Sequence, residues 1–287
     1  MSETGVAGSR WRAVVDVLAL VGPVTLLSGI LYYFGYVSAR TFYAYFGISL
    51  SILEFSPASY LVRSADTFFR PVATVLVVVL AVYTGHRLLG HYLARANPHR
   101  VRLVCLVVLA AGLALGALGV AGLYGWSLGL VSPLALAAAG LLVEYGLLLL
   151  ARHGKPAGAV AQLVGTGVYL RRGLLAALVL TAVFWAVTTL AQRRGERNAQ
   201  LTELTLVLQP QAVVYSDRDL SLPGPSIHRT VLDGRESAYR FRYNGLRPLL
   251  HANDRWFLLP VHWRHDNGST VIVLHDEPGR VRVDLAP

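Results

Sequence analysis

Long apolar runs dominate the first two thirds of the chain. Each run approaches the ~20 residues that a helix needs to cross the hydrocarbon core of a bilayer. The pattern predicts about five transmembrane helices, at residues 14–33, 72–89, 103–124, 128–151 and 174–191. The predicted fold class is therefore an α-helical membrane protein, with a helical membrane domain over residues 1–197.

The connection between the first two runs, residues 38–69, is rich in aromatic side chains. It contains Phe42, Tyr43, Tyr45, Phe46, Phe55 and Tyr60. The segment is too polar to span a bilayer and more apolar than an ordinary loop, so we expect it to lie in or dip into the membrane interface. Within it, Ser56 and Pro57 have the form of an N-cap and a first helical residue. They predict a short helix through Ser64, before Pro71 begins the second span.

After Arg197 the pattern changes to short stretches in which apolar and polar residues alternate, as is typical of strands. Strands are expected at 239–243, 255–261, 270–274 and 281–285, and an earlier pair at 204–208 and 212–215. Turn-forming sequences such as Asn253-Asp254 and Asp266-Asn267-Gly268 separate them, and residues 217–237 have the composition of a loop. Residues 198–287 are therefore expected to form a small antiparallel β-meander domain.

The charge of the chain is unevenly placed. The formal net charge is +10, but residues 198–287 hold ten arginines and ten acidic residues, so the excess lies in the helical part. Positive residues near span ends follow the positive-inside rule, and this explanation makes nucleic acid an unexpected partner.

Arginine placement also predicts orientation. With the N-terminus inside, more arginines flank the cytoplasmic span ends than the outer ones, and five spans then leave the C-terminal domain outside the cell membrane. Arg193 and Arg194, directly after the last span, argue against this orientation.

Glu144 lies well inside the fourth expected span and is the candidate intramembrane polar site. An ionisable group at this depth is costly and is a functional-site hypothesis by default. It could serve a proton or cation relay, or it could pair with Arg102 or another inner-leaflet arginine, or be protonated. We favour the structural role, because no second buried acid or histidine continues a relay.

Other side chains favour packing or solvation over chemistry. Gly112, Gly116, Gly119 and Gly122 predict close approach of a neighbouring helix. His262 and His265 fall on opposite faces if their segment is a strand, which disfavours a metal site with His251 or His275. Cys105 is the single cysteine. We expect no metal, no cofactor and no catalytic residue.

Arginines in the C-terminal domain form a possible binding row. Arg240, Arg242 and also Arg247 could share one face of a strand and meet lipid phosphates or acidic groups of a partner. The alternative is a solvated face balanced by neighbouring acids.

Two regions resemble uncharacterised multi-pass membrane proteins of GC-rich bacteria. The first is Phe42-Tyr43-Ala44-Tyr45-Phe46-Gly47-Ile48, followed by Phe55-Ser56 and Tyr60-Leu61-Val62-Arg63-Ser64. The second, near the C-terminus, is Asn244-Gly245-Leu246-Arg247, Arg255-Trp256-Phe257-Leu258-Leu259-Pro260 and Val281-Arg282-Val283. The resemblance covers the first external segment and the β domain. It implies the same architecture and no particular activity.

These patterns predict a non-enzymatic, multi-pass membrane protein of the cell envelope that presents a β domain to a protein, lipid or wall partner. One alternative is a transport or channel component that uses Glu144. A second is a membrane-embedded enzyme, which needs a polar cluster of Glu54, Arg63 and Asp66 with the sheet. The bilayer is the expected partner, an envelope protein or an anionic lipid is a further candidate, and self-association is left open.

Overall fold

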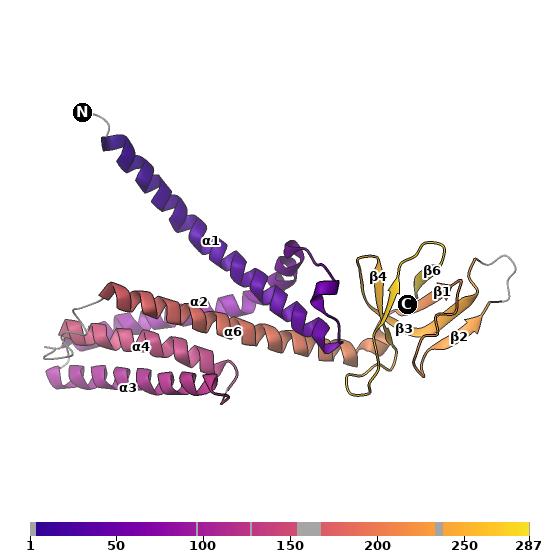
Figure 1. Cartoon of the computed structure of the whole chain (residues 1–287). Coiled ribbons are helices and arrows are strands. Elements are labelled where there is room, and N and C mark those ends of the chain that lie inside the picture. Colours follow the sequence, from indigo (N-terminus) through magenta and orange to yellow (C-terminus); the bar gives the residue numbers. More distant parts are fainter. Residues whose placement is uncertain (1–3, 96, 127, 154–167, 233–237, 287) are drawn as a thin grey trace. The chain divides into compact units, whose positions relative to one another are not determined.

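A computed structural model describes residues 4–95, 97–126, 128–153, 168–232 and 238–286 (Figure 1). Within the helices, it leaves out the side chains of residues 4–23, 63–72, 94 and 98. The long helices are α1 (Thr4–Tyr45), α2 (Pro57–Arg95), α3 (Pro98–Leu123), α4 (Val131–His153) and α6 (Val168–Leu204). Two short 3-10 helices, η1 (Leu50–Ile52) and η2 (Leu206–Leu208), follow α1 and α6.

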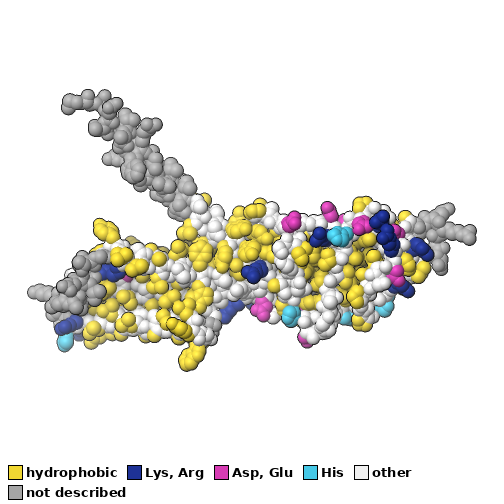
Figure 2. Space-filling model, in the orientation of Figure 1, with side chains coloured by type: hydrophobic (Ala, Val, Ile, Leu, Met, Phe, Trp, Pro, Cys, Tyr) yellow, Lys and Arg dark blue, Asp and Glu magenta, His cyan; other side chains and the backbone are white. Residues whose placement is uncertain are grey.

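Four helices among the described residues are long and apolar enough to cross a membrane. Their bounds are Ala73–Leu93, His99–Leu123, Val131–Arg152 and Val168–Leu204. These helices indicate insertion into a membrane, and Figure 2 shows hydrophobic side chains over much of their visible surface. The sequence predicted about five spans. The remaining one, 14–33, falls within α1, where the side chains of residues 4–23 lie outside the description.

The helix that begins at Pro57 is longer than predicted. Its start after Ser56 is confirmed, but the expected break before Pro71 is wrong, because α2 is continuous from Pro57 to Arg95. A proline removes one backbone hydrogen bond, and apolar helices in membranes tolerate this loss better than soluble ones.

The chain divides into two compact units. We call Met1–Phe34 with Leu61–Leu190 the helical unit, and Gly35–Tyr60 with Ala191–Pro287 the β unit. The β unit therefore combines most of the ring-rich segment with residues that lie more than a hundred positions further along the chain.

The β unit contains an antiparallel sheet, as predicted. Its strands are β1 (Gln211–Ser216), β2 (His228–Val231), β3 (Phe241–Ala252), β4 (Arg255–Pro260), β5 (Ile272–His275) and β6 (Val281–Ala286). The order is β5-β4-β3-β1-β6, and β2 pairs with β3. The consecutive strands β2, β3, β4 and β5 pair in sequence order as a meander, whereas β6 returns to pair with β1.

Two strand assignments need correction. Residues 204–208 are not a strand, because Leu204 ends α6 and the next residues form η2. Leu206 is buried in the core, and its packing outweighs the strand-like alternation of this stretch. The stretch 217–237 is also not loop throughout, since it contains β2, whose four residues are all exposed.

A tight turn and a bulge opposite β1 shape β3. Its hairpin with β4 turns at Asn253 and Asp254, which both have positive φ, as a two-residue type I′ turn requires. Opposite β1, the partners change from Ala212–Leu246 to Val214–Tyr243, so β3 carries one extra residue. This bulge lets Tyr243 and Leu246, three positions apart, both be buried in the core.

Candidate functional site

Glu144 forms an ion pair with Arg171 inside the helical unit. The Arg171 Nε donates to Glu144 Oε2 at 2.7 Å and its Nη2 donates to Oε1 at 3.2 Å. The Glu144 side chain is 12% exposed and that of Arg171 is 24% exposed. Two parallel hydrogen bonds of this kind are among the stronger pairings in proteins. The partner is thus one of the arginines expected at the inner leaflet, and Arg102, named as a candidate, is not it.

The depth of the pair follows from its place on the two helices. Arg171 lies in the first turn of α6, just before the apolar run that begins at Leu174. Glu144 lies nine residues before the end of α4 at His153, about 13 Å along a helix. The carboxylate therefore lies level with the polar start of α6, where an arginine can reach it, and not beside the apolar middle of that helix.

A groove of about 600 Å³ adjoins this pair between α3, α4 and α6. Its lining is apolar except for Glu144 and Arg171: Gly112, Leu113, Gly116, Ala117, Leu136, Ala139, Gly140, Val143, Leu147, Leu174, Leu175 and Leu178. A Cβ on Gly112 would lie 2.9 Å from the Val143 side chain, and one on Gly119 would lie 2.8 Å from Leu136. The prediction that these glycines allow close helix packing is confirmed.

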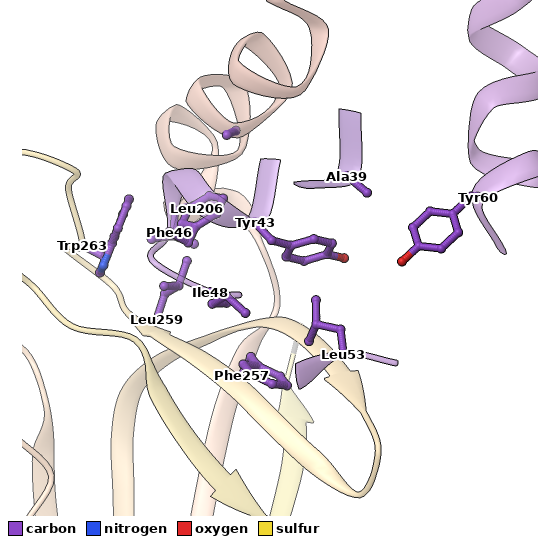
Figure 3. Packing of buried hydrophobic residues seen from close by; sticks show 11 residues of the cluster. Ala39, Tyr43, Phe46, Ile48, Leu53, Tyr60, Leu206, Phe257, Leu259 and Trp263 are labelled. Carbon is purple, nitrogen blue, oxygen red and sulfur yellow. The ribbon is translucent and has the colours of Figure 1, made fainter. Parts of the chain in front are cut away.

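A second candidate site is a hydrophobic cluster in the β unit, which we call the junction cluster (Figure 3). Its buried members are Ala39, Tyr43, Phe46, Ile48, Leu53, Tyr60, Ala199, Leu206, Phe257, Leu259 and Trp263. They come from the end of α1, the η1 region, the start of α2, the end of α6 and the β4 region. Figure 3 shows Ile48 and Leu53 directed toward Phe257 on β4.

Close backbone contacts surround the junction cluster. A Cβ on Gly35 would lie 2.2 Å from the Tyr60 carbonyl oxygen, and one on Gly195 would lie 2.4 Å from the Ser38 carbonyl oxygen. Only glycine allows these helices to approach so closely. The ends of α1, α2 and α6 therefore form a tight base for the sheet.

Rings and one carboxylate complete the edge of this cluster. The Phe46 and Trp263 rings lie 4.9 Å apart, and the His265 ring stacks on Tyr45 with centroids 4.3 Å apart. The Tyr45 hydroxyl donates to Glu203 Oε2 at 2.5 Å, and the His265 backbone N–H donates to Glu203 Oε1 at 3.4 Å. The His265 Nδ1 lies 2.9 Å from the Tyr45 carbonyl oxygen, so Nδ1 carries a hydrogen.

The environment of Tyr45 disfavours its ionised form. Burial is the main cause and the hydrogen bond to Glu203 is the next, and together they raise the pKa of Tyr45 to about 12. Tyr45 therefore acts as a donor to Glu203 at neutral pH.

The histidines lie elsewhere than predicted. His262 and His265 follow the end of β4 at Pro260 and are not on a strand, so the argument from opposite strand faces does not apply. His251 lies 3.3 Å from Asp276 and against the Trp256 ring. Within the described ranges, no three His, Cys, Asp or Glu side chains gather as metal ligands would.

In the predicted arginine row, the register with β1 places Arg242 and Arg247 on one face of β3, but the two side chains make different contacts. Arg240 precedes β3, and the Arg242 guanidinium lies 6.0 Å from the centre of the Tyr215 ring. Beyond the bulge, Arg247 donates from Nη1 to the Gln209 carbonyl oxygen at 2.6 Å and from Nη2 to that of Val207 at 3.2 Å. The Arg247 guanidinium thus holds the segment after α6 against the sheet.

A polar cluster that the sequence did not indicate fixes the loop after β1. The buried Tyr243 hydroxyl donates to Asp219 Oδ1 at 2.8 Å and accepts from the Leu220 N–H at 2.8 Å. Hydrogen bonds from the Ser221 N–H and Tyr243 lower the pKa of Asp219, which also pairs with Arg229. Each group in the cluster has a partner, which indicates a structural role.

The polar cluster that the enzyme alternative needs, with Glu54, Arg63 and Asp66, is not seen among the described side chains. Glu54 is exposed, and the side chains of Arg63 and Asp66 lie outside the described residues.

Comparisons of the chain with protein-family models, curated proteins and solved structures give no match. The resemblance to multi-pass proteins of GC-rich bacteria therefore stays a prediction.

Proposed function

We propose that this chain is a non-enzymatic integral membrane protein of the cell envelope that presents its β domain to a protein, lipid or cell-wall partner. The junction cluster carries the proposal, because the sheet and the ends of three helices share one hydrophobic core. A domain attached only by a mobile linker would not need buried rings from residues 35–60. The arrangement favours a sheet that is built onto membrane helices for display.

The sheet has surfaces suited to a partner. All four residues of β2 are exposed, and Val273 on β5 and Leu285 on β6 are 47% and 54% exposed. β5 and β6 end the sheet order, so each has a single strand neighbour among the described strands. Edge strands of this kind can pair with an extended segment of another molecule.

Photo-crosslinking in intact cells tests this proposal. A photo-reactive residue at Val273 or Leu285 is expected to give a discrete adduct with an envelope component, and the same residue at the exposed position Leu76 of α2 serves as control. Adducts of equal pattern from all three positions, or none from the sheet, would overturn the proposal.

The side of the membrane is a further part of the proposal. The arginine distribution favours an extracytoplasmic β domain. A reporter active only outside the cytoplasm, fused after Pro287, is expected to be active. Fluorescence from a reporter that matures only in the cytoplasm would reverse the orientation and move the search for a partner inside.

The transport alternative is less well supported by the geometry of Glu144. Arg171 neutralises the carboxylate through two hydrogen bonds, and the adjoining groove is otherwise apolar. A conducting path needs a hydrated polar lining. Ion flux in liposomes that depends on Glu144, and is lost in Glu144→Gln, would favour transport instead.

A further inference from the structure

We infer that the groove between α3, α4 and α6 binds one anionic phospholipid, with an acyl chain along the groove and the headgroup phosphate beside Arg172. The inference concerns the helical unit alone and is independent of what the β domain binds. It rests on the lining, the length and the charge of the groove.

The lining suits a hydrocarbon chain. Leucines from three helices line the groove, and the small residues Gly116 and Ala139 leave it open between them. A Cβ on Gly116 would lie 3.6 Å from the Ala139 Cβ, an ordinary contact, so space remains above this position. A volume of about 600 Å³ is within the range of small-molecule sites, about 300–1,000 Å³. In a bilayer, the molecules available to fill an apolar groove are lipids.

The length matches one leaflet. On α4 the groove runs from Leu136 to Leu147, and eleven residues of helix span about 16 Å. Half of a hydrocarbon core of about 30 Å is nearly the same depth. An acyl chain that enters beside Glu144 and Arg171 would thus run along α4 for about 12 Å, as far as Leu136.

The positive charge beside Glu144 favours an anionic lipid headgroup. Glu144 faces two arginines, Arg171 with Nε 2.7 Å from a carboxylate oxygen and Arg172 with Nε 3.8 Å away. One carboxylate against two guanidinium groups leaves a surplus of one positive charge among these three residues. Arg172 is 58% exposed, so its guanidinium can also reach a phosphate. Basic pockets between membrane helices bind anionic headgroups by this means.

Native mass spectrometry of the full chain tests the inference. The purified protein is mixed with phosphatidylglycerol or phosphatidylcholine of identical acyl chains, and lipid retained after detergent removal is counted. We expect one tightly held phosphatidylglycerol, preferred over phosphatidylcholine by about fivefold.

Two variants test headgroup recognition and acyl-chain binding separately. Arg172→Gln is expected to abolish the preference while both lipids still bind, and Gly116→Leu, which fills the groove, is expected to reduce retention of both. Arg197→Gln, an exposed arginine near the other end of α6, is the control and should change neither. Circular dichroism confirms that each variant keeps its helices.

Three results would overturn the inference. Equal retention of the two lipids by the unaltered protein would remove the role of Arg172. Unchanged binding in Gly116→Leu would place the lipid elsewhere. A dimer mass that disappears in Gly116→Leu would show that a second copy of the chain occupies the groove.

Discussion

The Tyr45 hydroxyl donates a 2.5 Å hydrogen bond to the Glu203 carboxylate, and this contact joins the last residue of α1 to the last turn of α6. The other oxygen of Glu203 accepts the backbone N–H of His265, from the segment after β4. One carboxylate thus links three segments that are distant in sequence. It lies at the edge of the junction cluster, where it fixes the helix ends to the sheet.

Tyr45→Phe is therefore expected to destabilise the β unit. The substitution removes a hydrogen bond to a charged acceptor, a loss of about 1.5–3 kcal/mol in the free energy of unfolding. Unfolding by denaturant, followed by near-ultraviolet circular dichroism of Trp263 and the other rings, measures the change. Tyr169→Phe is the matched control, because Tyr169 is 91% exposed. Equal stability of the two variants would contradict a role for the hydroxyl.

The same tyrosine predicts a dependence of stability on alkaline pH. The folded pKa of Tyr45, about 12, lies above its ordinary value of 10.0, so the folded chain holds the phenol proton more tightly than the unfolded chain. This contribution is complete below pH 10 and is lost as the pH rises from 10 to 12. The unaltered protein should lose more stability over this interval than Tyr45→Phe, as measured by denaturant unfolding at each pH. Parallel curves would show that Tyr45 is not the group responsible.

Gly195→Ala tests the close approach of α6 and α1. The new Cβ would lie 2.4 Å from the Ser38 carbonyl oxygen, and backbone atoms cannot move aside without shifting a helix. Overpacking of this kind costs about 1–3 kcal/mol. Gly173→Ala is the control in the same helix, because nothing lies within 4 Å of its added Cβ. That change should be neutral or stabilise by up to about 1 kcal/mol through helix propensity. Thermal unfolding in detergent distinguishes the two, and similar melting temperatures would contradict the packing.

Glu144→Gln should destabilise the helical unit. It leaves the partly buried Arg171 without its carboxylate partner, and hydrogen bonds to charged groups contribute about 1.5–3 kcal/mol. The double variant Glu144→Gln with Arg171→Gln removes both charges and should be more stable than Glu144→Gln alone. Loss of helical signal on heating measures both. Additive effects in the double variant would mean that the two side chains do not act as a pair.

Local patterns predicted the parts of this fold that depend on local physics. Apolar runs gave the four described spans, because lipid requires about 20 apolar residues in a row. Alternation and turn residues located β1, β4, β5 and β6, and Asn253-Asp254 identified the β3–β4 turn. The strand expected at 239–243 covers only the beginning of β3, which continues to Ala252. The Glu144 carboxyl group was expected to pair with Arg102 or another inner-leaflet arginine, or to be protonated, and the structure pairs it with Arg171.

Contacts between residues that are distant in sequence could not be predicted from local patterns. Aromatic residues at a membrane interface and in a protein core have the same composition, so Tyr43 and Phe46 gave no sign that they pack with the sheet. The bulge in β3 redirects Arg247 toward the carbonyl groups of Val207 and Gln209, and alternation alone could not show it. The strand predicted at 204–208 was wrong for the same reason, because Leu206 lies in η2 and packs in the junction cluster.

The junction cluster also predicts how the C-terminal domain behaves alone. A fragment of residues 198–287 keeps the whole sheet but loses every member of the cluster that comes from residues 39–60. Phe257, Leu259 and Trp263, each at most 4% exposed in the full chain, would face water. Exposing three such side chains costs about 1.5–3 kcal/mol each, comparable in total with the stability of a small domain.

We expect this fragment to be unfolded or aggregated, with little dispersion in its amide NMR spectrum. A second fragment, in which residues 35–60 are joined to residues 191–287 by a flexible linker, should recover a dispersed spectrum, because it restores the buried rings. Replacing Phe46 by Ala in the second fragment should abolish the recovery, at a cost of about 3–5 kcal/mol. A well-dispersed spectrum from residues 198–287 alone would instead show that the sheet folds independently and that the ring-rich segment only rests on it.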